Sequence, residues 1–111
     1  MHQIVAHERA KAEIHEAPDQ IVENGLEKIN RALNSSKRSL QDELTKLSKV
    51  NEPIYRLRVQ DHRIYVVQHR GAAVAVLGVE KRASAYQSEV LSTIKERAEE
   101  FDPSVLAEGA A

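Results

Sequence analysis

The segment between residues 54 and 79 constrains the fold of this chain more than any other part. It holds three short runs of β-branched and apolar residues, separated by turn residues at positions 60–61 and 69–71. Runs of this kind, bounded by turn residues, predict an antiparallel meander of three strands. Gly71 suits the second turn because glycine adopts a positive φ without strain.

The third run, residues 72–79, is apolar on both of its faces. This pattern predicts a central strand that is covered on both sides. Strict alternation of side chains then places Val79 on the face of Leu77, opposite to Val76.

Arginines occupy defined positions on the first two strands. Alternation divides residues 54–59 into an apolar face and a face that carries Arg56 and Arg58. A two-residue turn at 60–61 gives a register with apolar residues opposite each other, with the pairs Val59–His62, Arg58–Arg63, Leu57–Ile64 and Arg56–Tyr65. Like charges opposite each other destabilise a sheet, so Arg58 and Arg63 need a negatively charged partner. The pattern leaves two partners open: a carboxylate from elsewhere in the fold, or a bound phosphate.

Charge is distributed unevenly along the chain, although the net charge is only −1. Residues 54–82 carry six basic and two acidic side chains, whereas residues 83–111 carry two basic and six acidic ones. The overall balance argues against a general nucleic-acid coat, and the local excess predicts an anion site. We expect the acidic last helix and the tail to lie over the basic face and to neutralise part of its charge.

The length of 111 residues predicts one domain, which we place at residues 1–103, with a disordered tail at 104–111. No cysteine is present, so disulfides and thiolate metal sites are excluded, and the scattered histidines predict no metal site. The N-terminus does not resemble a signal peptide, and no apolar run approaches the roughly 20 residues that span a bilayer. These features predict a soluble, cytoplasmic protein.

The remaining elements follow from periodicity and chain breaks. Residues 3–6 predict an edge strand, and residues 7–16 predict a helix that ends before Pro18. A second helix carries an apolar stripe from Ile21 to Leu33, within which Gly25 either weakens the helix or lets another element approach closely. Residues 39–50 suggest a third short helix. A last amphipathic helix ends at Asp102-Pro103.

The run from Tyr55 to Tyr65 resembles the central hairpin of the RelE/ParE superfamily of toxins. Its common form there is Tyr-Arg-Leu-Arg-Val-Gly-Asp-Tyr-Arg, followed by apolar residues and a tyrosine. Residues 79–86 are similar to the closing strand of the family, in which basic residues precede a tyrosine at the start of the last helix. The resemblance covers residues 3–95. It implies an α+β fold with an N-terminal strand and a helical hairpin packed on an antiparallel β-meander, then a C-terminal helix.

Resemblance to the RelE-like branch implies the toxin of a type II toxin–antitoxin pair, an mRNA interferase acting in the ribosomal A site. In that reaction an RNA 2′-hydroxyl attacks the adjacent phosphodiester, which yields a 2′,3′-cyclic phosphate and a free 5′-hydroxyl. The reaction requires fixed positive charge, a proton acceptor and a proton donor, and no metal or other cofactor. The implied partners are a cognate antitoxin, mRNA and the ribosome, and no membrane.

The resemblance also implies roles for individual residues. The transition-state charge would be stabilised by Arg63 and Arg82, and the RNA phosphates would be bound by Arg56 and Arg58. Tyr86 would stack on a displaced base. The general base stays open between Lys81 and His62, because an arginine is a poor proton acceptor.

Four residues depart from the family pattern. Gln60 stands in place of the hairpin glycine, and His62 stands in place of a tyrosine. Ala83 stands where the family has a second arginine, and Glu80 adds a negative charge. Two alternatives therefore remain. One is a ParE-like inhibitor of DNA gyrase, which shares the scaffold and lacks the nuclease residues. The other is a non-catalytic regulatory or interaction domain on the same scaffold.

Overall fold

The protein is a small α+β domain, seen here in a computed structural model that describes residues 4–34, 45–46, 54–69, 73–81 and 88–101. Within these ranges it contains three helices and a five-stranded mixed sheet. The helices are α1 (Glu8–Glu16), α2 (Asp19–Asn34) and α4 (Ser88–Phe101). The strands are β1 (Ile4–Ala6), β2 (Thr45–Lys46), β3 (Ile54–Val59), β4 (His62–His69) and β5 (Ala73–Lys81).

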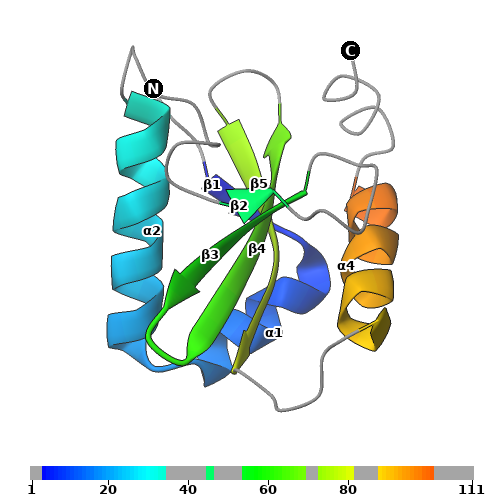
Figure 1. Cartoon of the computed structure of the whole chain (residues 1–111), viewed down its shortest axis with the longest axis horizontal. Coiled ribbons are helices and arrows are strands. Elements are labelled where there is room, and N and C mark those ends of the chain that lie inside the picture. Colours follow the sequence, from blue (N-terminus) through cyan, green and yellow to red (C-terminus); the bar gives the residue numbers. More distant parts are fainter. Residues whose placement is uncertain (1–3, 35–44, 47–53, 70–72, 82–87, 102–111) are drawn as a thin grey trace.

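The strands lie in the order β1-β5-β4-β3-β2 (Figure 1). β1 pairs in parallel with β5, and the other pairs are antiparallel. The predicted meander is therefore confirmed, and so are the edge strand near residue 4 and the register that joins Val59 to His62. Gln60 adopts a φ of 53° in the turn, a conformation that glycine adopts with less strain.

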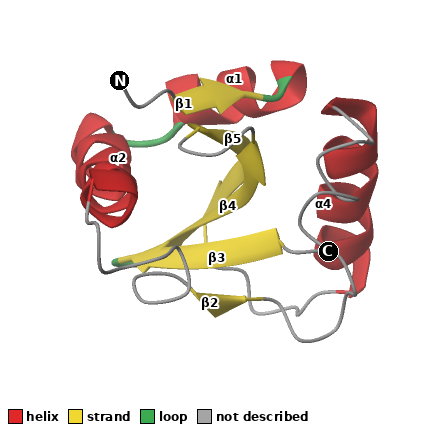
Figure 2. Cartoon of the chain, turned by 90° about the horizontal axis from the view of Figure 1, so that it is seen from above, coloured by secondary structure: helices red, strands yellow, loops and turns green. Residues whose placement is uncertain are grey.

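Helices cover both faces of the sheet (Figure 2). On one face, α1 and α2 pack on the inner strands through a core that contains Ala10, Ile21, Ile29, Leu57, Ile64 and Val76. On the other face, α4 packs through Ile94 and Ala98 onto Ile54, Tyr65, Val67, Ala75 and Leu77. The central strand β5 is buried from both sides, as its apolar sequence predicts. No helix within the described ranges is long and apolar enough to cross a membrane.

A β-bulge interrupts the pairing of β4 with β5. Tyr65 pairs with Gly78, but the next residue, Val66, pairs with Val76, so Leu77 is an extra residue in β5. An extra residue reverses the alternation beyond it. Val79 consequently lies in the core beneath α1 and α2, together with Val76. The prediction that Val79 shares a face with Leu77 is wrong for this reason.

The predicted third helix at residues 39–50 is wrong at its centre, where Thr45 and Lys46 form β2 and pair with Arg56 and Tyr55. The rest of that prediction lies outside the described residues, as does the predicted tail at 104–111. The helices predicted at 7–16, at 21–33 and after Tyr86 are confirmed as α1, α2 and α4.

Gly25 allows α2 to approach the sheet closely, since a Cβ atom at this position would overlap the Cδ1 atom of Ile64. Ile64 is 2% exposed and packed in the core. Alanine improves helix propensity by about 1 kcal/mol, whereas overpacking a core costs about 1–3 kcal/mol. We therefore expect Gly25→Ala to lower the free energy of unfolding by about 1 kcal/mol, the difference of these two effects.

Urea denaturation of a double-mutant cycle checks this expectation. Ile64→Val removes the Cδ1 atom that a new Cβ would meet. In that background, Gly25→Ala should leave stability unchanged or raise it. An equal loss of stability in both backgrounds would show that Ile64 is not the obstacle.

Candidate functional site

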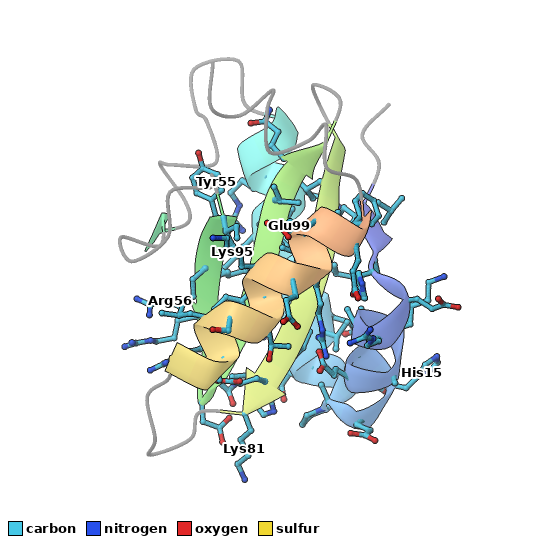
Figure 3. The ribbon with its side chains drawn as sticks, turned by 90° about the vertical axis from the view of Figure 1, so that its right-hand side faces the viewer. His15, Tyr55, Arg56, Lys81, Lys95 and Glu99 are labelled. Carbon is cyan, nitrogen blue, oxygen red and sulfur yellow. The ribbon has the colours of Figure 1, made fainter. Side chains whose placement is uncertain are left out.

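Three arginines gather on the face of the sheet that α4 also covers. The hairpin register places Arg58 of β3 directly opposite Arg63 of β4, and Arg56 opposite Tyr65. Arg58 is exposed, whereas Arg56 and Arg63 are partly buried. Figure 3 shows Arg56 extending away from the sheet beside α4. We call Arg56, Arg58 and Arg63 the arginine cluster.

A carboxylate completes the row of charges across the three strands. Arg63 pairs on one side with Arg58 and on the other with Glu80 of β5. One of the two partners that the sequence left open, a carboxylate, is therefore present. Glu80 lies on this face because the bulge has reversed the alternation of β5 before it.

Burial is the main influence on the ionisation of Glu80. It raises the pKa of Glu80 above its usual value of 4.5, the positive charge of Arg63 opposes this rise, and the negative charge of Glu13 adds to it. The net direction is upward. Glu80 therefore binds a proton more readily than an ordinary surface glutamate.

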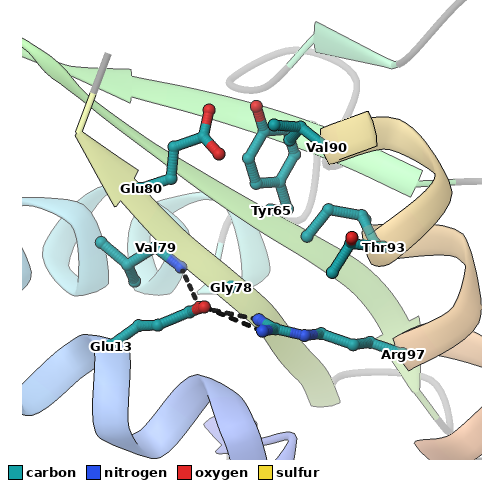
Figure 4. Close-up of a pocket in the computed structure, with 9 residues that line it drawn as sticks. Glu13, Tyr65, Gly78, Val79, Glu80, Val90, Thr93 and Arg97 are labelled. Atoms are coloured by element: carbon teal, nitrogen blue, oxygen red, sulfur yellow. Dashed lines mark hydrogen bonds and ion pairs between the residues drawn. The ribbon is translucent and has the colours of Figure 1, made fainter. Parts of the chain in front are cut away.

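Glu80 and Tyr65 lie next to each other at one end of a pocket of about 240 Å³ between the sheet, α1 and α4 (Figure 4). Tyr65 is 3% exposed, and its pKa is raised by burial and by Glu80, with Arg63 and Arg56 acting in the opposite direction. Val90 and Thr93 of α4 complete this part of the wall. Tyr65 therefore belongs to the core between the sheet and α4.

The other end of the pocket holds an ion pair that the sequence analysis missed. Glu13 of α1 accepts hydrogen bonds from Arg97 of α4 through both oxygens, at 2.7 and 2.8 Å. Arg97 also donates to the carbonyl oxygen of Leu77 at 3.0 Å, and Glu13 accepts from the backbone N–H of Val79 at 3.1 Å. The pair thus satisfies backbone groups at the bulge.

Gly78 leaves room for this pair against the strand. A Cβ atom there would lie 3.0 Å from Arg97 Nη1, from Glu13 Oε1 and from Ile94 Cδ1. The bulge, the glycine and the ion pair therefore form one unit that links α1, β5 and α4. This unit sets which face Glu80 occupies.

The two candidate bases lie on the opposite face of the sheet. His62 pairs with Lys81 across β4 and β5. Both line a pocket of about 370 Å³, together with Glu16 of α1 and Pro18 of the α1–α2 connection. His62 is 8% exposed. The structure therefore does not bring His62 and Lys81 together with the arginine cluster.

Asp61 is the partner of His62. The Nδ1 atom of His62 lies 2.7 Å from a carboxylate oxygen of Asp61. This hydrogen bond is the main reason why the pKa of Asp61 is lowered. The imidazole is therefore engaged with the hairpin turn.

Arg82 and Tyr86, the two other predicted site residues, lie outside the described residues. Among the residues that the structure does describe, no group of three or more potential ligands is arranged to hold a metal ion.

The acidic helix α4 lies on the face predicted for it, but its carboxylates are not all directed to the arginine cluster. Glu100 forms hydrogen bonds with His7 and Arg9 near α1, at 3.1 and 3.0 Å. Glu96 and Glu99 are exposed. Glu100 thus binds α4 to α1, and the neutralisation of the cluster by α4 stays a prediction.

No protein-family model matches the chain, and no curated protein matches it significantly.

Proposed function

We propose that the protein is the toxin of a toxin–antitoxin pair and cleaves mRNA as a metal-independent, RelE-like endoribonuclease. The observation that carries the proposal is the pairing of Arg58 with Arg63 across the hairpin, with Arg56 on the same face. Like charges placed opposite each other destabilise a sheet in isolation. Glu80 on β5 balances one of the two positive charges, and an anionic substrate would offset the other when it binds.

The chemistry of guanidinium groups suits the proposed reaction. A planar guanidinium donates two parallel hydrogen bonds to phosphate oxygens and stays charged at physiological pH. The buried Nε of Arg63 has no hydrogen-bond partner among the described residues, so the fold does not satisfy every donor of this guanidinium. Arg63 would stabilise the pentacoordinate phosphate together with Arg82, while Arg56 and Arg58 bind the flanking backbone.

The order of elements also supports the proposal. A strand, two helices, the short strand β2, a three-stranded meander and a final helix follow one another in the described chain. Apart from β2, this is the order that the resemblance implies. In the proposed account the toxin acts in the cytoplasm on mRNA in the ribosomal A site, and Tyr86 stacks on a displaced base. An antitoxin would cover the arginine cluster.

Expression under tight control tests the proposed function. We expect growth arrest together with new 5′ ends in mRNA, mapped by primer extension, that keep one position relative to the reading frame. An Arg63→Ala/Arg82→Ala variant, produced at the same soluble level, should show neither effect.

Two other outcomes would contradict the proposal. Growth arrest without new ends, combined with loss of gyrase supercoiling in a purified assay, would identify a gyrase inhibitor. Normal growth despite soluble protein would identify a non-catalytic domain.

A further inference from the structure

The proposed reaction needs a proton acceptor, and neither candidate from the sequence lies on the face of the arginine cluster. His62 is bound to Asp61 on the other face, and Lys81 pairs with His62 there. The acceptor should lie within hydrogen-bond reach of a ribose whose phosphate is held by Arg63. On β5, the residue paired with Arg63 is Glu80.

We propose that Glu80 is the general base that accepts the proton of the attacking 2′-hydroxyl. This assignment rests on the proposed nuclease function and names a catalytic residue for it. Its first support is geometric. The Cβ atoms of directly opposed residues lie roughly 4.5–5.5 Å apart, so a phosphate bound to Arg63 places its ribose beside the Glu80 carboxylate.

The pocket supplies a second support. Glu80 lines the same wall as Tyr65, and the two side chains lie next to each other (Figure 4). The base therefore lies in a half-open pocket rather than on a flat surface. Partial exclusion of water strengthens electrostatic interactions with a bound phosphate.

The charged groups around Glu80 come from every element packed against it. Arg63 and Tyr65 face it from β4, Glu13 contributes from α1, and Arg97 lines the same pocket from α4. Arg97 is held by Glu13 through both carboxylate oxygens. Among the described residues, Arg63 is the cation that acts on Glu80. Burial outweighs this attraction and raises the pKa of Glu80, a direction that suits a base working near neutral pH.

The step conserves atoms and charge. The Glu80 carboxylate takes the proton from the 2′-hydroxyl, and the 2′-oxygen forms a bond to phosphorus. The bond between phosphorus and the 5′-oxygen breaks, and that oxygen takes a proton from water. The products are the 2′,3′-cyclic phosphate and the 5′-hydroxyl, and the proton on Glu80 then returns to solvent.

Single-turnover cleavage of a ribosome-bound mRNA tests the assignment over a pH range that begins below the ordinary glutamate value of 4.5. Glu80→Gln should lower the maximal rate at pH 7 by roughly 10²-fold or more, with equal or tighter substrate binding because a negative charge is removed. In the wild type, the logarithm of the rate should fall by about one for each unit of pH at the acidic end, as a single protonation requires. The rate of Glu80→Asp should show the same fall at low pH (the acidic limb of the profile), and the rate of Glu80→Gln should not.

The controls separate this inference from the proposed function. Glu23→Gln removes an exposed carboxylate of α2, on the other face of the sheet, and should leave the rate unchanged. Thermal unfolding verifies that each variant is folded. Cleavage by the wild type that is lost in Arg63→Ala but unaffected in Glu80→Gln would overturn only the assignment of Glu80. An acidic limb that persists in Glu80→Gln would do the same. No cleavage by the wild type would overturn the nuclease function and the assignment together.

Discussion

Replacing Glu13 by alanine is expected to lower the free energy of unfolding by about 3 kcal/mol, because it leaves a buried arginine without its counter-charge. This value is at the lower end for a broken buried ion pair, since Glu13 keeps 32% of its side chain exposed while Arg97 keeps 11%. The loss also removes the acceptor for the Val79 N–H at the bulge. Against a typical total stability of about 5–15 kcal/mol, the effect is large and measurable by urea denaturation.

An exposed ion pair provides the matched control. Arg9 binds Glu100 at 3.0 Å, and both side chains are well exposed, at 60% and 46%. Pairs of this kind contribute at most about 1 kcal/mol, so Arg9→Ala should have a small effect. The double variant Glu13→Ala/Arg97→Met should lose less stability than the sum of its single changes, because it leaves no unpaired charge. Equal losses in Glu13→Ala and Arg9→Ala would contradict the structural role of the buried pair.

Replacing Arg63 by alanine is expected to lower the cleavage rate about 10²–10³-fold, the effect of removing one preorganised donor from a developing anionic charge. Arg63 is the member of the arginine cluster that lies between two charged neighbours, Arg58 and Glu80. Lysine keeps the positive charge but lacks the planar guanidinium that donates two parallel hydrogen bonds. Arg63→Lys should therefore retain only part of the wild-type rate. The measurement is the single-turnover rate at saturating protein.

Arg31 offers a matched control for the loss of an arginine. It is an exposed residue of α2 whose contact is an i,i+4 pair with Glu27 at 3.5 Å, remote from the arginine cluster. Arg31→Ala should leave the rate within a factor of about two, because surface pairs of this type contribute little. Equal cleavage rates for Arg63→Ala and Arg31→Ala would show that Arg63 does not belong to the site.

The hairpin and its faces could be predicted from the sequence because both depend on local rules. A strand alternates its side chains, and a two-residue turn fixes the partner of every residue near it. The predicted pairs from Val59–His62 to Arg56–Tyr65 are all present. The apolar stripes of α2 and α4 are local patterns as well, with a period of 3.6 residues.

The apolar pattern could not predict the bulge, since one extra residue in an apolar run leaves that pattern unchanged. Gly78 beside the bulge is a local signal for it. The reversal beyond Leu77 appeared only in the structure, and it moved Val79 to the other core. The strand at Thr45–Lys46 was missed for a related reason. Residues 39–50 show helical spacing, and the pairing with β3 overrides it at these two positions.

The Glu13–Arg97 pair joins residues far apart in the sequence, at helix positions where charged side chains usually face solvent. A signal was available in hindsight. Arg97 follows Ile94 by three positions and precedes Phe101 by four, so it lies on the buried stripe of α4. A charged residue within an apolar stripe calls for a partner, but no local rule identifies Glu13 as that partner.

Direct observation of the reaction products tests the proposed function most closely. Purified protein is added to ribosomes stalled on a defined mRNA, with Arg63→Ala as the inactive control, and both new RNA ends are characterised chemically. The account predicts one main cut in the A-site codon, with a 2′,3′-cyclic phosphate on the upstream fragment and a 5′-hydroxyl on the downstream fragment. Intact mRNA, or equal cleavage by the wild type and Arg63→Ala, would contradict it.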